Sequence, residues 1–526
     1  MKRATLLGQA REHPQPYDFI VIGGGATGAG VALDAAARGF DVLLLEAQDF
    51  GSGTSSRSSK LVHGGVRYLA QGRIGLVREA LYERARMYEN APHLVSILPI
   101  LVPAANRLEL ARFWIGLKIY DWLSGKASFG SSRYLSRRQL RVRMPAVADA
   151  GLAGAVEYFD GQFDDARFIL SLLKTAATYG ATPLNYCAVT ALNKRRDGQL
   201  HEVTVRDALS GYTFDVVARV LINATGPYTD SVLRLDDPNA VSLITPSQGA
   251  HLVVDRRFLP GNDGLLIPET PDGRIMFALP WHGHVVLGTT DTPLDKTPRE
   301  PVAQTAEINM ILETAARYLS PAPQKSDILA VFAGVRPLVR ASKRATAKLS
   351  RKHSIKISGS GLISVTGGKW TTYRKMAQDC VDCAIANSEL PAEPCRTASL
   401  TLHGAGEGAG VTSNLAIYGT DAASIQALIE KDPQLAEPLH PDLPYNAAQC
   451  VWAVREEMAM TLEDVLARRI QALFLNAGAA LECAPRVAAL LGLEMGWDRA
   501  RQERELAEFS QAAVPYLGPD TLSQSH

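Results

Sequence analysis

The sequence predicts an α/β protein in three parts: a parallel sheet near the amino end, an antiparallel sheet in the middle and an all-helical carboxyl-terminal region. Three observations predict this arrangement. A short apolar run leads into closely spaced glycines over residues 18–28, strand-like segments alternate with turn residues over 241–300, and Leu, Val and Ala recur at helical spacing from Asn446 onward. At 526 residues the chain is too long for one hydrophobic core, so we expect two or three structural units.

The composition is typical of a globular enzyme. Hydrophobic residues make up 46% of the chain and charged residues 21%. The 55 Lys and Arg residues nearly balance the 54 Asp and Glu residues, so no nucleic-acid partner is expected. Six cysteines do not make a disulfide framework in a chain of this length, and no apolar run is long enough to span a bilayer. We therefore expect a cytoplasmic protein with any membrane contact at its surface, and a loose leader over residues 1–16.

A βαβ unit is predicted directly after this leader. Residues 18–22 form a short β-branched run typical of a strand buried in a parallel sheet. The glycine cluster follows at once, residues 29–38 are small enough for a closely packed helix, and residues 42–45 form a second strand that ends at Glu46. Strand, glycines, helix, strand and acid in this order predict a dinucleotide-binding site.

Each residue of this pattern has a physical role in holding a dinucleotide. Gly23 permits a tight turn, Gly25 lets backbone N–H groups approach a pyrophosphate, and Gly28 lets the helix pack close to the sheet. The helix N-terminus attracts the phosphates, and Glu46 can accept hydrogen bonds from ribose hydroxyls. The pattern by itself does not separate NAD from FAD.

Three further segments are expected to line the cofactor. The stretch from Thr54 to Tyr68 is dense in donors and glycines, which suits a loop around a cofactor, although a solvated polar loop is the alternative. A strand over 216–222 runs into small residues, and a strand over 361–365 runs into two glycines and a helix over 371–386 whose N-terminus would stabilise negative charge. The expected cofactor contacts in these segments and near residue 334 are Thr54, Ser55, Ser59, Lys60, Leu61, His63, Gly65, Ala224, Thr225, Gly226, Gly334, Gly368 and Lys369.

A helix predicted over residues 108–123 has two interpretations. Apolar and aromatic side chains follow one face of it, and a basic cluster over 133–143 comes soon after. Such a stripe is most often ordinary core, but beside basic residues it could lie on an anionic membrane surface. The members of the stripe are Leu110, Phe113, Trp114, Leu117 and Tyr120. Near the predicted antiparallel sheet, His282 and His284 fit a hairpin turn better than a metal site, because no further ligands are evident nearby.

Taken together, these motifs resemble the FAD-dependent, respiratory glycerol-3-phosphate dehydrogenases. The matching stretches follow the family's order over roughly residues 16–515 and include Ile22–Gly30, Ser59–Leu69, Asn223–Pro227, Gly288–Asp291, Gly334–Leu338, Gly367–Lys369 and Leu462–Arg469. The resemblance implies a glutathione-reductase-like FAD domain over 17–95, 155–240 and 330–390. It also implies a substrate cap inserted at 96–154 and 241–329, and a helical domain over 391–526.

The resemblance implies oxidation of sn-glycerol 3-phosphate to dihydroxyacetone phosphate by hydride transfer to FAD, with the electrons passed to membrane quinone. It further implies peripheral attachment to the inner face of the cytoplasmic membrane, with a homodimer among the expected assemblies. The alternatives are an oxidase of the same fold that uses dioxygen, and an NAD-binding or non-catalytic nucleotide module.

Several side chains of the matched motifs suit this substrate. A phosphate dianion needs converging cations, since it is costly to desolvate without partners. The expected substrate contacts are Arg67, Tyr68, Arg336, Arg351, Lys369 and Thr372. His251 is the expected catalytic base, because imidazole titrates near neutral pH, with a core histidine as the alternative. Arg336 is the second expected catalytic residue, which orients and polarises the substrate.

Overall fold

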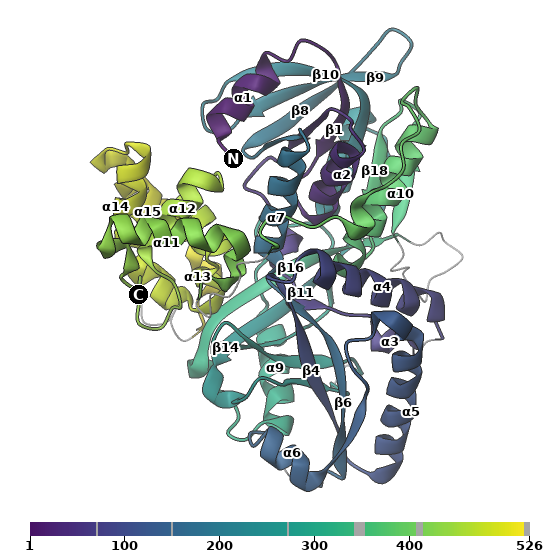
Figure 1. Cartoon of the computed structure of the whole chain (residues 1–526), viewed down its shortest axis with the longest axis vertical. Coiled ribbons are helices and arrows are strands. Elements are labelled where there is room, and N and C mark those ends of the chain that lie inside the picture. The colour runs from purple at the N-terminus through teal and green to yellow at the C-terminus, as the bar shows by residue number, and fades with distance from the viewer. Residues whose placement is uncertain (70–71, 149–150, 271–272, 341–352, 407–413, 520–526) are drawn as a thin grey trace.

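The computed structural model describes residues 1–69, 72–148, 151–270, 273–340, 353–406 and 414–519. Figure 1 shows three regions: one sheet with helices on its faces at the top, a second sheet with flanking helices at the bottom, and a helical region at the left. The first two regions are built from interleaved segments of the chain, whereas the third is formed by its carboxyl-terminal part. The predicted fold class is confirmed by this architecture.

The upper region contains an eight-stranded sheet in which strand β1 lies near the centre. The path through the sheet is β17-β18-β10-β1-β2-β7, and β1 pairs in parallel with β10 and β2. The strands are β1 (Tyr17–Ile22), β2 (Val42–Leu45), β7 (Thr182–Leu184), β8 (Cys187–Lys194), β9 (Leu200–Asp207), β10 (Thr213–Asn223), β17 (Ser354–Ile357) and β18 (Ile363–Thr366).

Helices cover both faces of this sheet. On one face α2, α7 and α10 share a hydrophobic core, and on the other α1 and α8 pack with the meander of β8 and β9. The helices are α1 (Arg3–Arg11), α2 (Ala26–Ala37), α7 (Asp165–Thr178), α8 (Thr229–Asp236) and α10 (Tyr373–Ala386).

The expectation of a loose leader over residues 1–16 was wrong. Residues 3–11 form α1, whose Ala10 is buried in the core beneath the sheet. The guanidinium of Arg3 donates to Asp207 over 2.7 Å and to the backbone carbonyl of Asn185 over 3.0 Å. These contacts connect the helix to residues about two hundred positions away, which a local pattern could not reveal.

The lower region is built on a ten-stranded, largely antiparallel sheet. Its path is β15-β11-β14-β13-β12-β4-β6-β3, with β16 also paired to β11 and β5 to β6. The strands are β3 (Leu61–Val62), β4 (Val95–Ala104), β5 (Arg133–Ser136), β6 (Gly154–Phe163), β11 (Ile244–Asp255), β12 (Gly264–Ile267), β13 (Met276–Trp281), β14 (His284–Gly288), β15 (Thr292–Pro293) and β16 (Ile328–Val339). The helices that flank it are α3 (Val66–Leu69), α4 (Ile74–Asn90), α5 (Arg107–Ser124), α6 (Arg137–Arg143) and α9 (Thr305–Tyr318).

Three strands of this sheet differ from the predicted division of the chain. Residues 61–62, 155–163 and 330–339 were assigned to the FAD domain, but β3, β6 and β16 hydrogen-bond in the lower sheet. The reason is antiparallel pairing over long distances: β6 returns along the whole of β4, and β16 runs along the whole of β11. Both strands lead directly back toward the upper region, so sequence position alone did not separate them from it.

The carboxyl-terminal region is helical, as predicted. Its helices are α11 (Ala422–Lys431), α12 (Ala447–Glu456), α13 (Ala472–Leu475), α14 (Ala477–Met495) and α15 (Arg499–Ala513), with a π-helix over Asp464–Arg469. A capping box precedes the π-helix: the Thr461 hydroxyl accepts from the Asp464 N–H, and the Asp464 carboxylate accepts from the Thr461 N–H, each over 3.2 Å.

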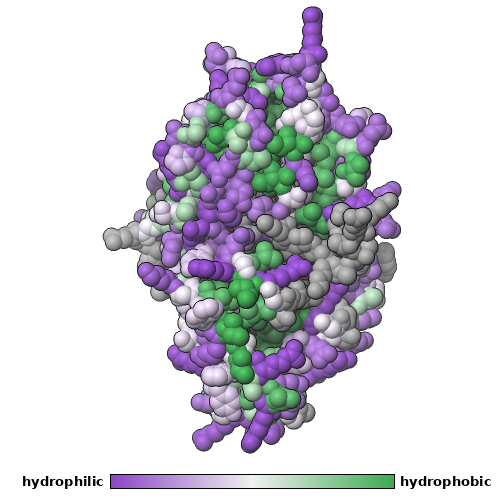
Figure 2. Space-filling view, turned by 90° about the vertical axis from the view of Figure 1, so that its right-hand side faces the viewer, coloured by the Kyte–Doolittle hydropathy of each residue, from purple (hydrophilic) through white to green (hydrophobic). Residues whose placement is uncertain are grey.

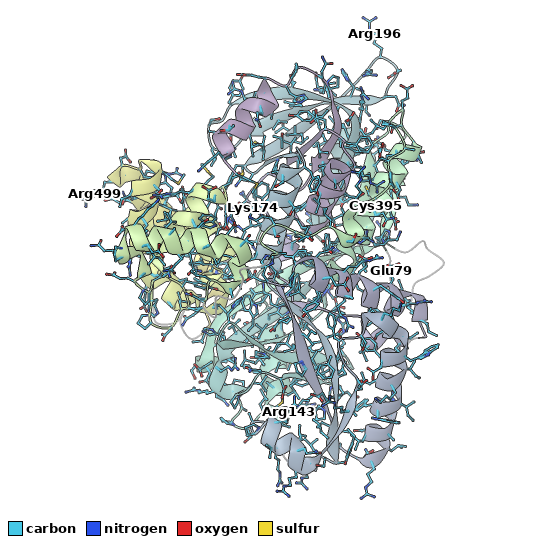
Figure 3. All side chains as sticks on the ribbon, viewed as in Figure 1. Glu79, Arg143, Lys174, Arg196, Cys395 and Arg499 are labelled. Carbon is cyan, nitrogen blue, oxygen red and sulfur yellow. The ribbon has the colours of Figure 1, made fainter. Side chains whose placement is uncertain are left out.

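Buried ion pairs attach this helical region to the upper region. Asp49 accepts from Arg468 and Arg469, each over 2.6 Å, and Arg167 makes a two-pronged contact with Glu457 at 2.6 and 2.7 Å. Lys174, labelled in Figure 3 where the two regions meet, donates to Asp421 over 2.6 Å. We refer to Asp49, Arg468 and Arg469 as the interface cluster.

Candidate active site

A cavity of about 710 Å³ lies where the two sheets meet. It is lined by the ends of β1 and β10 from the upper sheet and by β11 and β16 from the lower sheet. The carboxyl ends of parallel strands, where the order of the sheet reverses, are the usual ligand site in α/β folds. The dinucleotide motif therefore opens into the same space as the predicted substrate residues.

The three motif glycines are needed for close approach. Gly23 has a φ of +111°, and a Cβ there would lie 2.8 Å from the carbonyl oxygen of Ala224. A Cβ on Gly28 would lie 1.8 Å from the Gly23 carbonyl oxygen, so no larger residue fits. Gly25 caps α2, and the first turn of this helix lines the cavity. Backbone N–H groups and the helix dipole there suit a pyrophosphate.

Glu46 lines the cavity and also stabilises the glycine turn. Its carboxylate accepts from the N–H of Gly24 over 2.6 Å and from the N–H of Gln48 over 2.9 Å. Burial raises the pKa of Glu46, and these two N–H groups oppose the rise. Each carboxylate oxygen can accept a second hydrogen bond, so the predicted contact with ribose remains compatible with these bonds.

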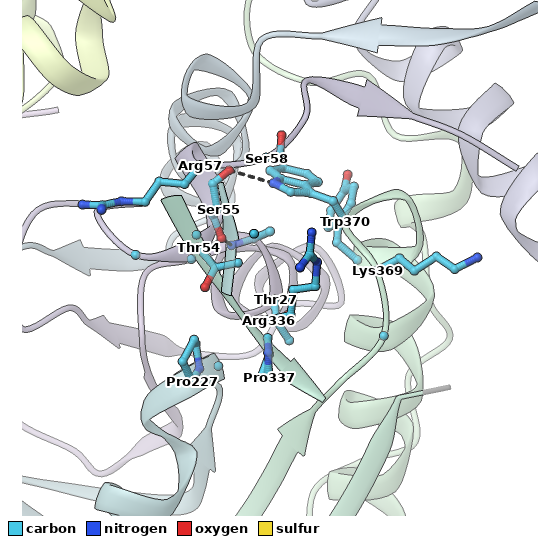
Figure 4. A pocket seen from close by; sticks show the side chains of 18 of the residues that line it. Thr27, Thr54, Ser55, Arg57, Ser58, Pro227, Arg336, Pro337, Lys369 and Trp370 are labelled. Atoms are coloured by element: carbon cyan, nitrogen blue, oxygen red, sulfur yellow. Dashed lines mark hydrogen bonds between the residues drawn. The ribbon is translucent and has the colours of Figure 1, made fainter. Parts of the chain in front are cut away.

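The loop after Gly53 forms one wall of the cavity. Thr54 donates to the carbonyl of Val335 over 2.5 Å, and the Ser55 hydroxyl accepts from the N–H of Ala26 over 3.0 Å. The indole N–H of Trp370 donates to the carbonyl of Ser55 over 2.9 Å, the dashed line in Figure 4. This bond connects the first wall to the segment that opens α10.

Lys60, an expected cofactor contact, lies outside the cavity lining. Its ammonium is fully buried and donates to Asp165 over 2.7 Å, to the Ser56 carbonyl over 2.8 Å and to Gln471 of the helical region over 3.3 Å. The buried carboxylate of Asp165 needs a cationic partner, and this ion pair holds the Lys60 ammonium outside the cavity lining. Figure 4 shows that Arg57 also extends away from Thr54, and its guanidinium pairs with Glu300.

The remaining expected cofactor contacts do line the cavity. They are Ser59, Leu61, His63, Gly65, Ala224, Thr225, Gly226, Gly334, Gly368 and Lys369. Gly334 leaves no room for a side chain, because a Cβ there would lie 2.8 Å from the backbone carbonyl of Arg57. Small residues on this wall therefore keep the strand close to the loop.

Tyr68 and Lys369 face each other on the opposite wall. The Lys369 ammonium lies 4.0 Å from the centre of the Tyr68 ring, in a cation–π contact. The hydroxyl of Thr372 donates to the Lys369 carbonyl over 3.2 Å, and Thr371 rather than Thr372 lines the cavity.

Two expected substrate contacts are not placed. The backbone of Arg67 belongs to α3 but its side chain lies outside the described part of the structure, and Arg351 falls in the segment 341–352, which is also outside it.

His251 lies on β11 at the cavity wall. Its Nε2 is 2.8 Å from the Ser59 hydroxyl, and its ring stacks on Phe332 with 4.7 Å between centres. Burial, the charge of Arg336 and the charge of Lys60 together hold the pKa of His251 well below its usual range. The imidazole is therefore neutral near pH 7, as a general base must be before it accepts a proton.

Arg336 lies on β16, the strand that pairs with β11. Its guanidinium donates to the Gln248 carbonyl over 3.2 Å, to Asp291 over 3.3 Å and to the Thr289 hydroxyl over 3.1 Å. A Cβ on Gly249 would lie 2.3 Å from the nearest guanidinium nitrogen, so this glycine leaves the space that Arg336 occupies. The two expected catalytic residues thus come from neighbouring strands of one sheet.

Arg274 and Asp291 are among the cavity residues that the sequence interpretation missed. Both line the cavity, and they form an ion pair with each other. An available signal was the position of Asp291, directly after a buried strand and two threonines. Arg274 gave a weaker signal, since it precedes β13 and its register could be known only from the folded sheet.

Comparisons with known proteins agree with this geometry. Residues 18–374 match the family of FAD dependent oxidoreductases, and residues 353–502 match the C-terminal domain of alpha-glycerophosphate oxidase. The chain is 41% identical to the mitochondrial glycerol-3-phosphate dehydrogenase of Macaca fascicularis, over 94% of this chain and 73% of that protein. The corresponding protein of Mus musculus is 42% identical over 93% of this chain and 72% of its own length. The chain belongs to the FAD-dependent glycerol-3-phosphate dehydrogenase family.

Solved structures show a likeness in fold as well. The glycerol-3-phosphate dehydrogenase of Bacillus halodurans complexed with FAD is 30% identical, has a TM-score of 0.79, and matches 98% of this chain and 97% of its own. The glycine oxidase of Geobacillus kaustophilus, 21% identical with a TM-score of 0.54 over 73% of this chain, shares the fold. The family resemblance inferred from the motifs is confirmed.

FAD, the cofactor of this glycerol-3-phosphate dehydrogenase family, fits the residues that surround the cavity. The glycine turn leaves no room for a Cβ at Gly23 or Gly28, and the α2 N-terminus faces the same space. Gly23, Gly25, the first turn of α2, Glu46 and the Thr54–Ser55 wall would hold the dinucleotide. His251 and Arg336 lie on the other sheet, so the dinucleotide motif and the expected catalytic residues approach the cavity from different regions.

Proposed function

We propose that this chain oxidises sn-glycerol 3-phosphate to dihydroxyacetone phosphate and passes the electrons to membrane quinone. The observation that carries the proposal is that a neutral buried histidine and an arginine lie on paired strands of a cavity that also contains the dinucleotide motif. FAD, when bound, supplies the hydride acceptor for this reaction. The named relatives, which are glycerol-3-phosphate dehydrogenases, agree with this choice of substrate.

His251 takes the proton of the substrate hydroxyl in this proposal. The Ser59 hydroxyl contacts Nε2 and fixes the ring orientation, and Phe332 restricts the ring from one face. Arg336 holds the reacting oxygen and stabilises the negative charge that develops on it as the proton leaves. The cation Lys369, on the opposite wall, contributes positive charge toward the phosphate group.

A surface on α5 supports the membrane part of the proposal. The predicted stripe is mainly core, since Leu110, Leu117 and Tyr120 are buried. A second apolar face of the same helix is exposed: Leu108 by 82%, Ile115 by 55%, Ile119 by 43% and Trp122 by 79%. We call these four residues the α5 apolar face. Figure 2, which views the molecule from the side on which α5 lies, shows a column of hydrophobic side chains in the lower half of that face.

Basic side chains lie on α6, the next α-helix along the chain. Arg137, Arg138 and Arg141 are exposed there, beside Val142, which is 78% exposed. Figure 1 places α5 and α6 at the same end of the molecule. Apolar side chains beside cations suit an anionic lipid surface, which quinone also occupies. Among the described helices, none is both long and apolar enough to cross a bilayer. We therefore propose peripheral attachment to the inner face of the cytoplasmic membrane.

The activity is tested by anaerobic bleaching of the bound flavin. We expect glycerol 3-phosphate to bleach it rapidly, and glycerol and hydroxy acids to bleach it only slowly. A colourless protein that releases no flavin on denaturation would contradict the proposal and favour a nucleotide-binding module.

The electron acceptor is tested by turnover with a soluble quinone analogue and with dioxygen. We expect fast quinone reduction, stimulated by detergent or lipid. Oxygen consumption at the full rate with stoichiometric peroxide, and no advantage from quinone, would assign the chain to the oxidases instead.

The membrane surface is tested by flotation with vesicles that contain anionic lipid. The double variant Ile115→Glu/Trp122→Glu should lose flotation and keep flavin bleaching. Leu493→Glu is the matched control, because Leu493 is 84% exposed on α14 of the helical region. If the double variant instead changes a homodimer to a monomer and vesicle binding is unaffected, the α5 apolar face is a subunit contact.

A further inference from the structure

Asp291 forms a bridge between two arginines of the cavity wall. Its Oδ1 accepts from Arg336 over 3.3 Å, and its Oδ2 pairs with Arg274. The two arginines come from separate segments, one on β16 and one just before β13. All three side chains line the cavity. We call them the cavity cluster.

Contacts on both sides of Asp291 fix its backbone. The hydroxyls of Thr290 and Thr292 both donate to the carboxylate of Glu307, over 2.7 and 2.6 Å. Glu307 is buried on α9, and the Thr290 hydroxyl also accepts from the N–H of Ala250 over 2.8 Å. A short hydrogen bond from the Ser247 hydroxyl to Oδ1 further restricts the Asp291 side chain. The carboxylate is therefore a fixed acceptor for both guanidiniums.

The Arg336 side chain is confined in the same way. Its guanidinium lies over Gly249, where a Cβ would come within 2.3 Å, and it donates to Thr289 over 3.1 Å. Guanidinium groups bind phosphate through directed N–H pairs, so an orientation fixed in advance improves binding because less side-chain entropy is lost.

We propose that Asp291 is a positioning residue that holds Arg274 and Arg336 side by side, and that Arg274 is a further specificity-determining residue for an anionic phosphate ester. The inference rests on the proposed function, and it adds a further cation and its anchor to the substrate site. The carboxylate offsets part of the repulsion between the guanidiniums, and the cluster of three keeps a formal surplus of one positive charge. That surplus faces the cavity.

The charge of Asp291 makes the proposal sharply testable. Replacing it with Asn raises the formal surplus of the cluster from one positive charge to two. If only net charge mattered, an anion would bind Asp291→Asn more tightly than the native protein. If positioning matters, the freed guanidiniums repel each other and turn away, so the anion binds more weakly. The two accounts predict opposite signs.

The experiment measures binding and turnover separately on the FAD-loaded enzyme. Dihydroxyacetone phosphate and inorganic phosphate are titrated by their perturbation of the flavin absorbance, and KM and kcat are measured with glycerol 3-phosphate. We expect the dissociation constants and KM of Asp291→Asn and Arg274→Met to rise roughly ten- to a hundredfold, with a smaller change in kcat. Asp291→Glu, which keeps the charge, should recover part of the affinity.

Asp263→Asn is the matched control. Asp263 pairs with Arg143 on α6 of the same region, through distances of 2.6 and 2.8 Å, but neither residue lines the cavity. This variant should leave both phosphate affinity and KM unchanged. The slow oxidation of uncharged glycerol should be nearly equal in the native protein and in Arg274→Met, because glycerol lacks the anionic group.

Tighter phosphate binding in Asp291→Asn, or an equal loss with glycerol and glycerol 3-phosphate in Arg274→Met, would overturn the inference. The outcome is distinguishable from failure of the proposed function. If native flavin is not bleached by glycerol 3-phosphate, the function fails, whereas the inorganic phosphate titrations of Asp291→Asn and Arg274→Met still decide whether the cavity cluster recognises an anion.

Discussion

The interface cluster and the cavity cluster have the same composition, one aspartate shared by two arginines, but their surroundings differ. At the interface, the side chains of Asp49 and Arg469 are 0% exposed and that of Arg468 is 5% exposed. In the cavity, the exposures are 22% for Asp291, 24% for Arg336 and 30% for Arg274. One cluster is closed in by protein and the other borders an open volume. The same ion-pair chemistry therefore stabilises a domain contact in one place and recognises a ligand in the other.

The closed surroundings also explain the electrostatics of the interface cluster. Burial alone would raise the pKa of Asp49, but Arg469 and Arg468 outweigh it and hold the pKa well below its usual range. The carboxylate is therefore charged at all ordinary pH values, and its removal would leave the buried Arg469 without its ion-pair partner, whereas Arg468 would keep Glu463 and Asp464. No such penalty applies to the cavity cluster, because water can reach it.

The largest expected effect tests this difference directly. Asp49→Asn should lower the free energy of unfolding by about 3–5 kcal/mol, because breaking a buried pair leaves charge unpaired. Asp291→Asn, the same change in the open cluster, should lower it by less than about 1 kcal/mol. Denaturant unfolding of both holoproteins, followed by circular dichroism, measures the two values. Equal losses of stability would remove the distinction between the clusters.

The next effect concerns catalysis rather than stability. Arg336→Ala should reduce kcat/KM by roughly 10²–10³-fold while the protein keeps its flavin, because a charge-stabilising donor is lost from the site. Gly25→Val is the converse variant: the added Cβ would lie 2.9 Å from the Ser55 hydroxyl, and this crowding should cause loss of the flavin itself. Flavin content by absorbance separates the two. A flavin-replete and fully active Arg336→Ala would remove this arginine from the site.

A milder change moves Arg336 without removing it. Gly249→Ala should lower kcat/KM by about tenfold, the effect of about 1.4 kcal/mol, because the added methyl group displaces the guanidinium. The backbone at Gly249 is extended within β11, so alanine is tolerated there and the melting temperature should change little. The matched control is Gly116→Ala on the surface helix α5. Gly39→Ala is unsuitable, because Gly39 has a positive φ. Unchanged kinetics would mean that Arg336 relocates freely.

The smallest effect is a shift in pH dependence. The folded-state pKa of His251 lies well below about 6.5, the value of an exposed imidazole, so protonation favours the unfolded protein. The neutral His251 ring makes its full contribution to the free energy of unfolding above the pKa of an exposed imidazole. This contribution is lost as the pH falls below that pKa. The acid limb of flavin reduction should therefore lie well below pH 6.5. Arg336→Gln should move this limb upward because one cation is gone, and Arg336→Lys should not. An acid limb near 6.5 in the native protein would exclude His251 as the titrating base.

Much of the dinucleotide site could be predicted because its parts are neighbours in the chain. Gly23, Gly28 and Glu46 belong to one βαβ unit, whose periodicity and spacing are visible in the sequence. Lys60 could not be placed in this way, since its partner Asp165 lies 105 positions away and decides which way the ammonium turns. The pairing of Arg274 with Asp291 follows the register of the hairpin of β13 and β14, in which Phe277 lies opposite Gly288, and this register could be read only from the folded sheet.

The bond between Trp370 and Ser55 has a consequence for synthesis of the protein. The two residues are 315 positions apart, and the partners Asp49 and Arg469 are 420 apart. The glycine turn of the dinucleotide motif is therefore synthesised long before the segment around Trp370, which forms the opposite wall of the cavity. Contacts of such long range form late in folding. Both walls of the cofactor site are therefore present only once most of the chain has been synthesised.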